Sequence, residues 1–128
     1  MEQDSVKKKR ILLIEDDSFI AQLYALKFKQ TPYEFNQARD GDEGIALAKD
    51  QKPDLILLDI ILPKNNGFTI LENLKKDETT KDIPVILLTN LGQQENIQKG
   101  MTLGAVDYII KAHHTPQEVV TKIEPFLR

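Results

Sequence analysis

Four short runs of consecutive apolar residues constrain the fold of this chain more than any other feature. The runs are Ile11–Ile14, Leu55–Leu58, Val85–Leu88 and Tyr108–Ile110. None of them alternates between apolar and polar residues, which is typical of strands that are buried on both faces of a parallel sheet. A weaker candidate strand, 33–39, lies between the first two runs. The chain is therefore predicted to contain five strands.

Segments with helical periodicity separate these strands. The predicted apolar stripes are Ile20, Leu23, Tyr24 and Phe28; Gly67, Ile70, Leu71 and Leu74; and Val119, Val120, Ile123, Phe126 and Leu127. The last helix opens with a capping box, Thr115 to Glu118, and a shorter helix is predicted over 42–49. Segment 94–101 has few large apolar residues and is the least anchored. This β-α order predicts an α/β fold, an open parallel sheet with helices on both faces.

Composition narrows the functional classes. The 128 residues suit one domain, and 41% apolar with 29% charged residues is ordinary for a globular protein. The absence of Cys excludes thiol chemistry and thiolate metal sites. A net charge of −3 argues against a nucleic-acid partner, and no apolar run approaches the roughly 18 residues of a membrane span. We expect a cytoplasmic protein, with a polar leader over 1–8 and one domain over 9–128.

Polar residues stand where the predicted strands end. Glu15, Asp16 and Asp17 follow the first strand, Asp59 the third, Thr89 the fourth and Lys111 the fifth. The carboxyl ends of parallel strands meet at one edge of the sheet, where ligands bind. Two carboxylates about 4 Å apart repel each other by roughly 4 kcal/mol at an effective dielectric constant near 20. A proton, Lys111 or a cation must offset that repulsion.

Carboxylate oxygens without His or Cys suit Mg²⁺, which also binds phosphate oxygens. Lys111 and Thr89 would then be free to contact a phosphoryl group, and an Asp could act as the nucleophile. Taken singly, each residue has a simpler interpretation: Asp17 or Ser18 as a helix cap, Asp59 as a turn residue, Thr89 as a cap and Lys111 as a solvated side chain. Taken together they predict metal-dependent phosphoryl transfer onto an Asp. His113 and His114 are interpreted as solvated loop residues.

The ordered set of motifs resembles the receiver domain of two-component response regulators, from about Lys9 to Leu127. The matching segments are 11–17, 38–44, 53–63, Gly67, 84–89 and 104–111. The resemblance implies a (βα)5 doubly wound, flavodoxin-like fold with strand order 2-1-3-4-5. It also implies a phosphorylation-dependent signalling switch, which is not an enzyme beyond catalysing its own phosphorylation and dephosphorylation.

Residue roles follow from the same resemblance. Asp59 is the implied phosphoacceptor, attacking a phosphohistidine of a histidine kinase or histidine phosphotransfer protein. Glu15, Asp16, Asp59 and the backbone carbonyl of Ile61 are the implied Mg²⁺ ligands. Lys111 would pair with phosphoryl oxygens, Thr89 would bond one of them, and Tyr108 would be an aromatic switch that moves with Thr89. The output surface would comprise the fourth helix, fifth strand and fifth helix.

Two residues depart from the family pattern. Ala112 stands where the family usually has a Pro after a cis bond, so that bond is either cis or the loop runs trans with a different approach of Lys111. Asn90 stands where a small residue is usual, and its bulk would narrow access to the site.

Ile61 and Leu91 are aliphatic at positions that flank the acyl phosphate in the family. They cannot orient water by hydrogen bonds, which predicts slow self-dephosphorylation.

Three alternatives remain beside a stand-alone receiver with an unidentified protein target. A phosphatase of the haloacid dehalogenase type would need an Asp at position 61, where this chain has Ile61. A flavodoxin-like flavin binder would place the FMN phosphate beside Glu15, Asp16 and Asp17, which would repel it. A degenerate receiver would lack key side chains that are present here. The chain ends at Arg128, soon after the last predicted helix. We therefore expect one of three situations: the domain signals through contacts with other proteins, it is an intermediate in a phosphorelay, or the sequence was cut from a longer chain.

Overall fold

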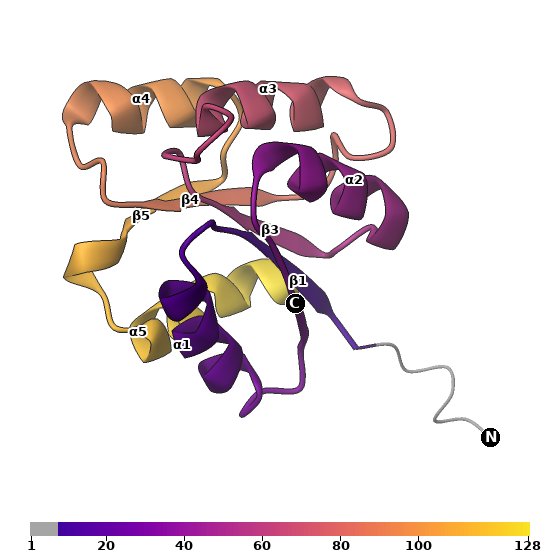
Figure 1. Ribbon diagram of the computed structural model, residues 1–128, viewed down its shortest axis with the longest axis vertical. Coiled ribbons are helices and arrows are strands. Elements are labelled where there is room, and N and C mark those ends of the chain that lie inside the picture. Colours follow the sequence, from indigo (N-terminus) through magenta and orange to yellow (C-terminus); the bar gives the residue numbers. More distant parts are fainter. Residues whose placement is uncertain (1–7) are drawn as a thin grey trace.

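The computed structural model describes residues 8–128, which form a single parallel sheet flanked by helices (Figure 1). The predicted leader therefore lies almost wholly outside the described residues. The elements in chain order are β1 (Arg10–Ile14), α1 (Ser18–Phe28), β2 (Glu34–Ala38), α2 (Gly41–Gln51), β3 (Leu55–Leu58), α3 (Gly67–Lys76), β4 (Val85–Thr89), α4 (Gln94–Thr102), β5 (Asp107–Ile110) and α5 (Pro116–Ile123). Short 3-10 helices follow β5 and α5, over Lys111–His113 and Glu124–Leu127.

The five strands are all parallel and lie in the order β2-β1-β3-β4-β5. This is the predicted order, so the fold class is confirmed. The order reverses beside β1, whose neighbours are β2 and β3. Loops that follow β1 and β3 therefore diverge to opposite faces and leave a crevice at the carboxyl edge, which is where such sheets bind ligands.

Alternate strand residues pack on opposite faces because a strand has a side-chain period of two. On one face, Leu13 and Leu57 pack with α1 and α5; on the other, Leu12 and Leu58 pack with α2 and α3. Figure 1 shows α1 and α5 on one side of the sheet and α2, α3 and α4 on the other. All residues of β3 and β4 are buried. The centre of the sheet is thus fully buried, whereas the edge strands β2 and β5 are partly exposed.

Side-chain caps fix where four helices begin. Asp17 accepts hydrogen bonds from the backbone N–H groups of Phe19 and Ile20, as the capping interpretation predicted. Asp40 and Asn66 cap α2 and α3 in the same way. Thr115 and Glu118 form the predicted capping box of α5. Each cap satisfies N–H groups that a helix cannot satisfy itself.

Two predicted stripe residues are wrong. Leu23 is 40% exposed, and Ala21 takes its place in the core beside Tyr24 and Phe28. The first helix is apolar on several sides, so helical spacing alone fits more than one stripe. Phe126 is also exposed, because the chain changes after Ile123 to a 3-10 helix with three residues per turn. That change leaves Phe126 at the surface, while Leu127 stays in the core as predicted.

Helix α4 is the least anchored, as predicted, since Gly100 is its one buried residue. A Cβ at Gly100 would lie 2.3 Å from Leu87 Cδ1, so the glycine allows α4 to approach β4. Within residues 8–128, no helix has the length and apolar content that crossing a membrane requires.

Candidate phosphotransfer and metal site

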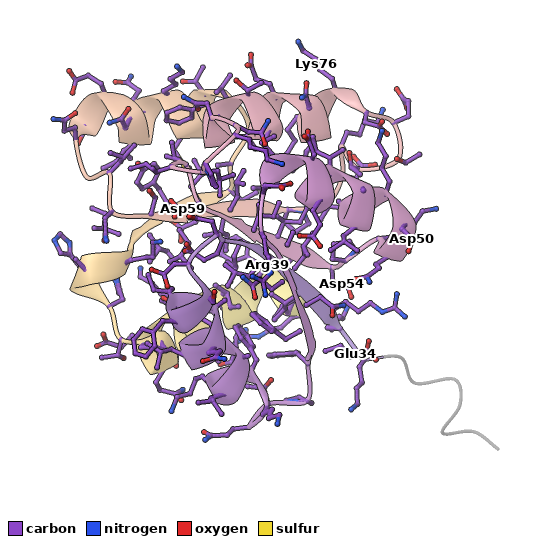
Figure 2. The ribbon with its side chains drawn as sticks, in the orientation of Figure 1. Glu34, Arg39, Asp50, Asp54, Asp59 and Lys76 are labelled. Carbon is purple, nitrogen blue, oxygen red and sulfur yellow. The ribbon has the colours of Figure 1, made fainter. Side chains whose placement is uncertain are left out.

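The predicted site residues converge at the carboxyl edge of the sheet. Glu15 and Asp16 follow β1, Asp59 follows β3, Thr89 ends β4 and Lys111 follows β5. Figure 2 shows Asp59 at one end of β3 and Asp54, which precedes the strand, at the other. The arrangement results from parallel pairing, which aligns the ends of β1, β3, β4 and β5.

Three carboxylates form a compact acidic cluster. One oxygen from each of Glu15, Asp16 and Asp59 lies within 4.8 Å of the others. Glu15 and Asp59 are buried, whereas Asp16 is exposed. An all-oxygen set of this kind fits a hard divalent cation such as Mg²⁺, which typically uses carboxylates and retains several waters. Burial raises the pKa of Glu15, and the hydrogen bond from Lys111 opposes that rise.

Lys111 bridges the two buried carboxylates. Its ammonium lies 2.7 Å from Glu15 Oε1 and 2.9 Å from Asp59 Oδ2, with the Lys111 side chain only 11% exposed. Burial lowers the pKa of Lys111, but the hydrogen bonds to Glu15 and Asp59 outweigh burial and leave that pKa raised. The ammonium is therefore held charged beside Asp59, where it can offset the repulsion between the acidic groups.

Backbone contacts hold Glu15 in place. Its carbonyl oxygen accepts a hydrogen bond from Gln37 Nε2 at 2.9 Å, and its Oε2 accepts one from the backbone N–H of Asp17 at 3.1 Å. The sequence did not reveal the role of Gln37, since that residue belongs to a different strand and carries no distinctive pattern. Both carboxylate oxygens of Glu15 are thus engaged, and the side chain is fixed in one orientation.

The backbone of Asp59 is closely packed by α3. A Cβ added at Gly67 would lie 2.4 Å from the Asp59 carbonyl oxygen, so only glycine allows this approach. Ile61 donates its backbone N–H to Asp59 Oδ1 at 3.3 Å and forms a bridge with Asn66. The loop after β3 consequently folds back so that its backbone contacts the Asp59 side chain.

Thr89 and Tyr108 contact the loop between β4 and α4. The backbone N–H of Leu91 lies 3.4 Å from Thr89 Oγ1, and the carbonyl of Leu91 accepts a hydrogen bond from the Tyr108 hydroxyl. Thr89 is fully buried, while Tyr108 is half-buried. Burial, followed by the nearby charge of Asp59, raises the pKa of Tyr108. The hydrogen bonds of both side chains therefore meet at Leu91.

The sequence left open whether the peptide bond between Lys111 and Ala112 is cis or trans. No cis peptide bond occurs in the part of the chain described here, so Lys111 and Ala112 are joined in trans. Even so, Lys111 reaches Asp59. Asn90 Oδ1 accepts a hydrogen bond from the backbone N–H of Ala112 at 2.7 Å, a contact that the sequence did not predict. His114 Nδ1 lies 3.1 Å from the carbonyl of Ile110, so His114 packs against the turn.

Comparison with known proteins identifies the family. Residues 11–124 match the response regulator receiver domain. The chain is 43% identical over 119 residues to the DNA-binding dual master transcriptional regulator RpaA of Synechocystis, covering 93% of this chain and 49% of RpaA. It is 36% identical to the phosphate regulon transcriptional regulatory protein PhoB of Escherichia coli, covering 94% of this chain and 52% of PhoB. The chain thus spans about half the length of these curated relatives.

Solved structures agree with that match. A CheY-like receiver domain protein from Methanospirillum hungatei superposes with a TM-score of 0.87 at 30% identity, covering 94% of both chains. The phosphorylated cyanobacterial phytochrome response regulator RcpA gives a TM-score of 0.82 at 33% identity, again covering 94% of both. The family match, the strand order and the acidic edge all agree: the chain belongs to the family of response regulator receiver domains, the signalling domains of two-component systems.

Proposed function

We propose that Asp59 is the phosphoacceptor of this receiver domain and that a histidine kinase or a histidine phosphotransfer protein supplies the phosphoryl group. The observation that carries the proposal is the convergence of the three carboxylates of Glu15, Asp16 and Asp59 beside the Lys111 ammonium. Residues 9–128 would form the receiver domain, preceded by a short polar leader. The chain would catalyse its own phosphorylation and dephosphorylation and turn over no other substrate.

The proposed reaction is an in-line displacement at phosphorus. A carboxylate oxygen of Asp59 attacks the phosphohistidine, an oxygen–phosphorus bond forms, and the phosphorus–nitrogen bond breaks to release imidazole. Glu15, Asp16, Asp59 and the Ile61 carbonyl would hold Mg²⁺, which would neutralise charge on the phosphoryl oxygens. Lys111 already lies at Asp59 and would move its ammonium onto a phosphoryl oxygen, while the Thr89 hydroxyl would donate to another.

The switch would run through the loop that follows β4. Drawing the Thr89 hydroxyl toward a phosphoryl oxygen weakens its contact with the Leu91 N–H, and Leu91 is also the residue to which Tyr108 is bonded. Movement at Thr89 would therefore reach Tyr108 on β5. Helix α4, with one buried residue, is an element of low local stability that can shift in response. The α4-β5-α5 surface would then present a different face to a protein target.

Phosphorylation with a small donor tests this proposal. The protein is incubated with acetyl phosphate and Mg²⁺, and the modified residue is located by mass spectrometry. We expect one phosphate per chain, labile at alkaline pH, on wild type and none on Asp59→Asn. Asp54→Asn is the matched control, because it removes a carboxyl at the opposite end of the same strand and should label normally.

A second arm tests the metal. Isothermal titration of wild type with Mg²⁺ should show one site, and Asp16→Asn should weaken it strongly, because that variant removes one of the three carboxylates of the cluster. Equal labelling of Asp59→Asn and wild type would remove Asp59 from its proposed role. Turnover of a phosphate ester would instead favour a phosphatase, and a purified protein that carries flavin would contradict the receiver mechanism.

A further inference from the structure

Asn90 connects the loop that carries Thr89 to the turn that carries Lys111. Asn90 directly follows Thr89 at the end of β4, and Ala112 directly follows Lys111 after β5. The Asn90 Oδ1 atom accepts a hydrogen bond from the Ala112 N–H at 2.7 Å, across 22 residues of sequence. Since β4 and β5 are neighbours, with Thr89 paired to Ile110, the contact crosses the carboxyl edge between two adjacent strand ends.

The Ala112 N–H needs a partner from outside its own helix. It is among the first N–H groups of the 3-10 helix Lys111–His113, and such groups have no partner within the helix. The residue at the cap position of this helix, Ile110, has no polar side chain and makes no capping bond. Asn90 therefore caps the helix from the neighbouring strand. The cap fixes the backbone from which the Lys111 side chain extends.

The position of that backbone matters for Lys111 because its side chain is long and flexible. The ammonium makes two short contacts, to the buried carboxylates of Glu15 and Asp59. A shift of the turn after Lys111 would move the ammonium away from Glu15 and Asp59, and water would replace the carboxylates as its hydrogen-bond partners. Among residues 8–128, Asn90 is the side chain that accepts from an N–H of this helix, while His114 Nδ1 contacts the carbonyl of Ile110 on the same turn at 3.1 Å.

We propose that Asn90 is a positioning residue for phosphoryl transfer: its amide oxygen holds the trans turn after Lys111 so that the ammonium lies at Asp59. This inference rests on the proposed function, in which Asp59 is the phosphoacceptor and Lys111 its cationic partner. In this inference the Asn90 side chain acts through its hydrogen-bond acceptor. If Asn90 instead limited access to the site, only the size of its side chain would matter.

Variants of Asn90 separate these two roles. Asn90→Leu keeps the bulk and removes the acceptor, Asn90→Ala removes both, and Asn90→Asp keeps an acceptor oxygen. The matched control is Gln94→Leu, which changes an exposed polar side chain just beyond the same loop. Two readouts are measured: hydrogen exchange of the Ala112 amide by NMR, and the rate constant for phosphorylation of Asp59 at saturating acetyl phosphate and Mg²⁺.

We expect Asn90→Leu and Asn90→Ala to accelerate Ala112 exchange and to reduce the saturating rate constant by about threefold to tenfold, the usual effect of one hydrogen bond. Their KM for acetyl phosphate should change less than the rate constant. Asn90→Asp should retain slow Ala112 exchange, and Gln94→Leu should match wild type in both readouts.

Other patterns would overturn the inference. Faster labelling of Asn90→Ala with an unchanged Asn90→Leu would make Asn90 a steric gate. Faster Ala112 exchange with unchanged labelling in both variants would make the bond structural only. If wild type gains no phosphate at Asp59 while its Ala112 amide is protected, the proposed function fails and this inference fails with it. Normal wild-type labelling with an unprotected Ala112 amide would overturn this inference alone.

Discussion

Tyr108 donates a hydrogen bond from its hydroxyl to the backbone carbonyl of Leu91, whose own N–H lies 3.4 Å from Thr89 Oγ1. One residue of the β4–α4 loop thus receives contacts from both side chains that the family resemblance assigned to switching. The Tyr108 ring also packs against Gly100, where an added Cβ would lie 3.4 Å from Cδ2. Tyr108 consequently ties the loop and α4 to β5.

The first prediction concerns this tie. Tyr108→Phe keeps the ring but removes the hydroxyl, which leaves the Leu91 carbonyl to solvent. We expect the free energy of unfolding to fall by about 1 kcal/mol, the usual contribution of one hydrogen bond. Amide exchange should accelerate in 90–93 and remain unchanged in β3. Urea denaturation and NMR exchange measure the two effects, and Tyr33→Phe serves as the control. Uniform acceleration across the sheet would contradict a local role.

The second prediction concerns the charge balance around Asp59. Lys111→Met removes the cation that lies between Glu15 and Asp59. Breaking a buried ion pair by removing one partner typically costs about 3 kcal/mol. We expect a loss of that size in EDTA and a smaller loss in millimolar Mg²⁺, because a bound cation offsets the same repulsion. Lys64→Met, on the exposed loop after β3, should show neither effect. Equal losses with and without Mg²⁺ would contradict this account of the site.

The third prediction concerns the lifetime of the phosphorylated state. Ile61 is 59% exposed, Leu91 is partly buried, and both line one open hollow of about 560 Å³ between the β3–α3 loop and α4. Neither side chain can hydrogen-bond to water. We expect Ile61→Asn and Leu91→Glu each to speed loss of phosphate about fivefold, equivalent to one water-orienting hydrogen bond. Decay of the labelled protein after removal of the donor gives the rate. Ile61→Leu is the apolar control, and a decay rate that all variants share would refute the idea.

The fourth prediction concerns pH and a surface far from the site. Hydrogen bonds from the Thr79 side chain and backbone, together with Lys49, lower the pKa of Asp77 from 3.8 to about 2. A depressed carboxyl pKa means that the ionised group stabilises the folded state above pH 3.8 and loses that effect as the pH falls toward 2. Asp77→Asn should therefore lower the urea midpoint at pH 6, and the difference from wild type should shrink below pH 3.8 and vanish only below pH 2. A difference independent of pH would exclude the carboxylate charge as its cause. Asp50→Asn is the control.

The sheet was predictable because its strands are continuous apolar runs, and the site was predictable because parallel strands place their carboxyl ends together. The predictions that Leu23 and Phe126 are buried were wrong for local reasons. The first helix is apolar on several sides, and the last helix changes to a 3-10 helix before Phe126. Asn90 and Ala112 each appeared only as a departure from the family pattern. That the two are bonded depends on the register of β4 and β5, which no local pattern specifies.

Helix α1 carries apolar side chains on its outer side, with Phe19 and Leu26 both more than half exposed, while its inner side packs into the core. Because both sides are apolar, the side that faces the sheet is held by the core contacts of Ala21, Tyr24 and Phe28, while the Asp17 cap fixes where the helix begins. Loss of those core contacts would change which side chains of α1 reach solvent and so alter the protein's tendency to self-associate.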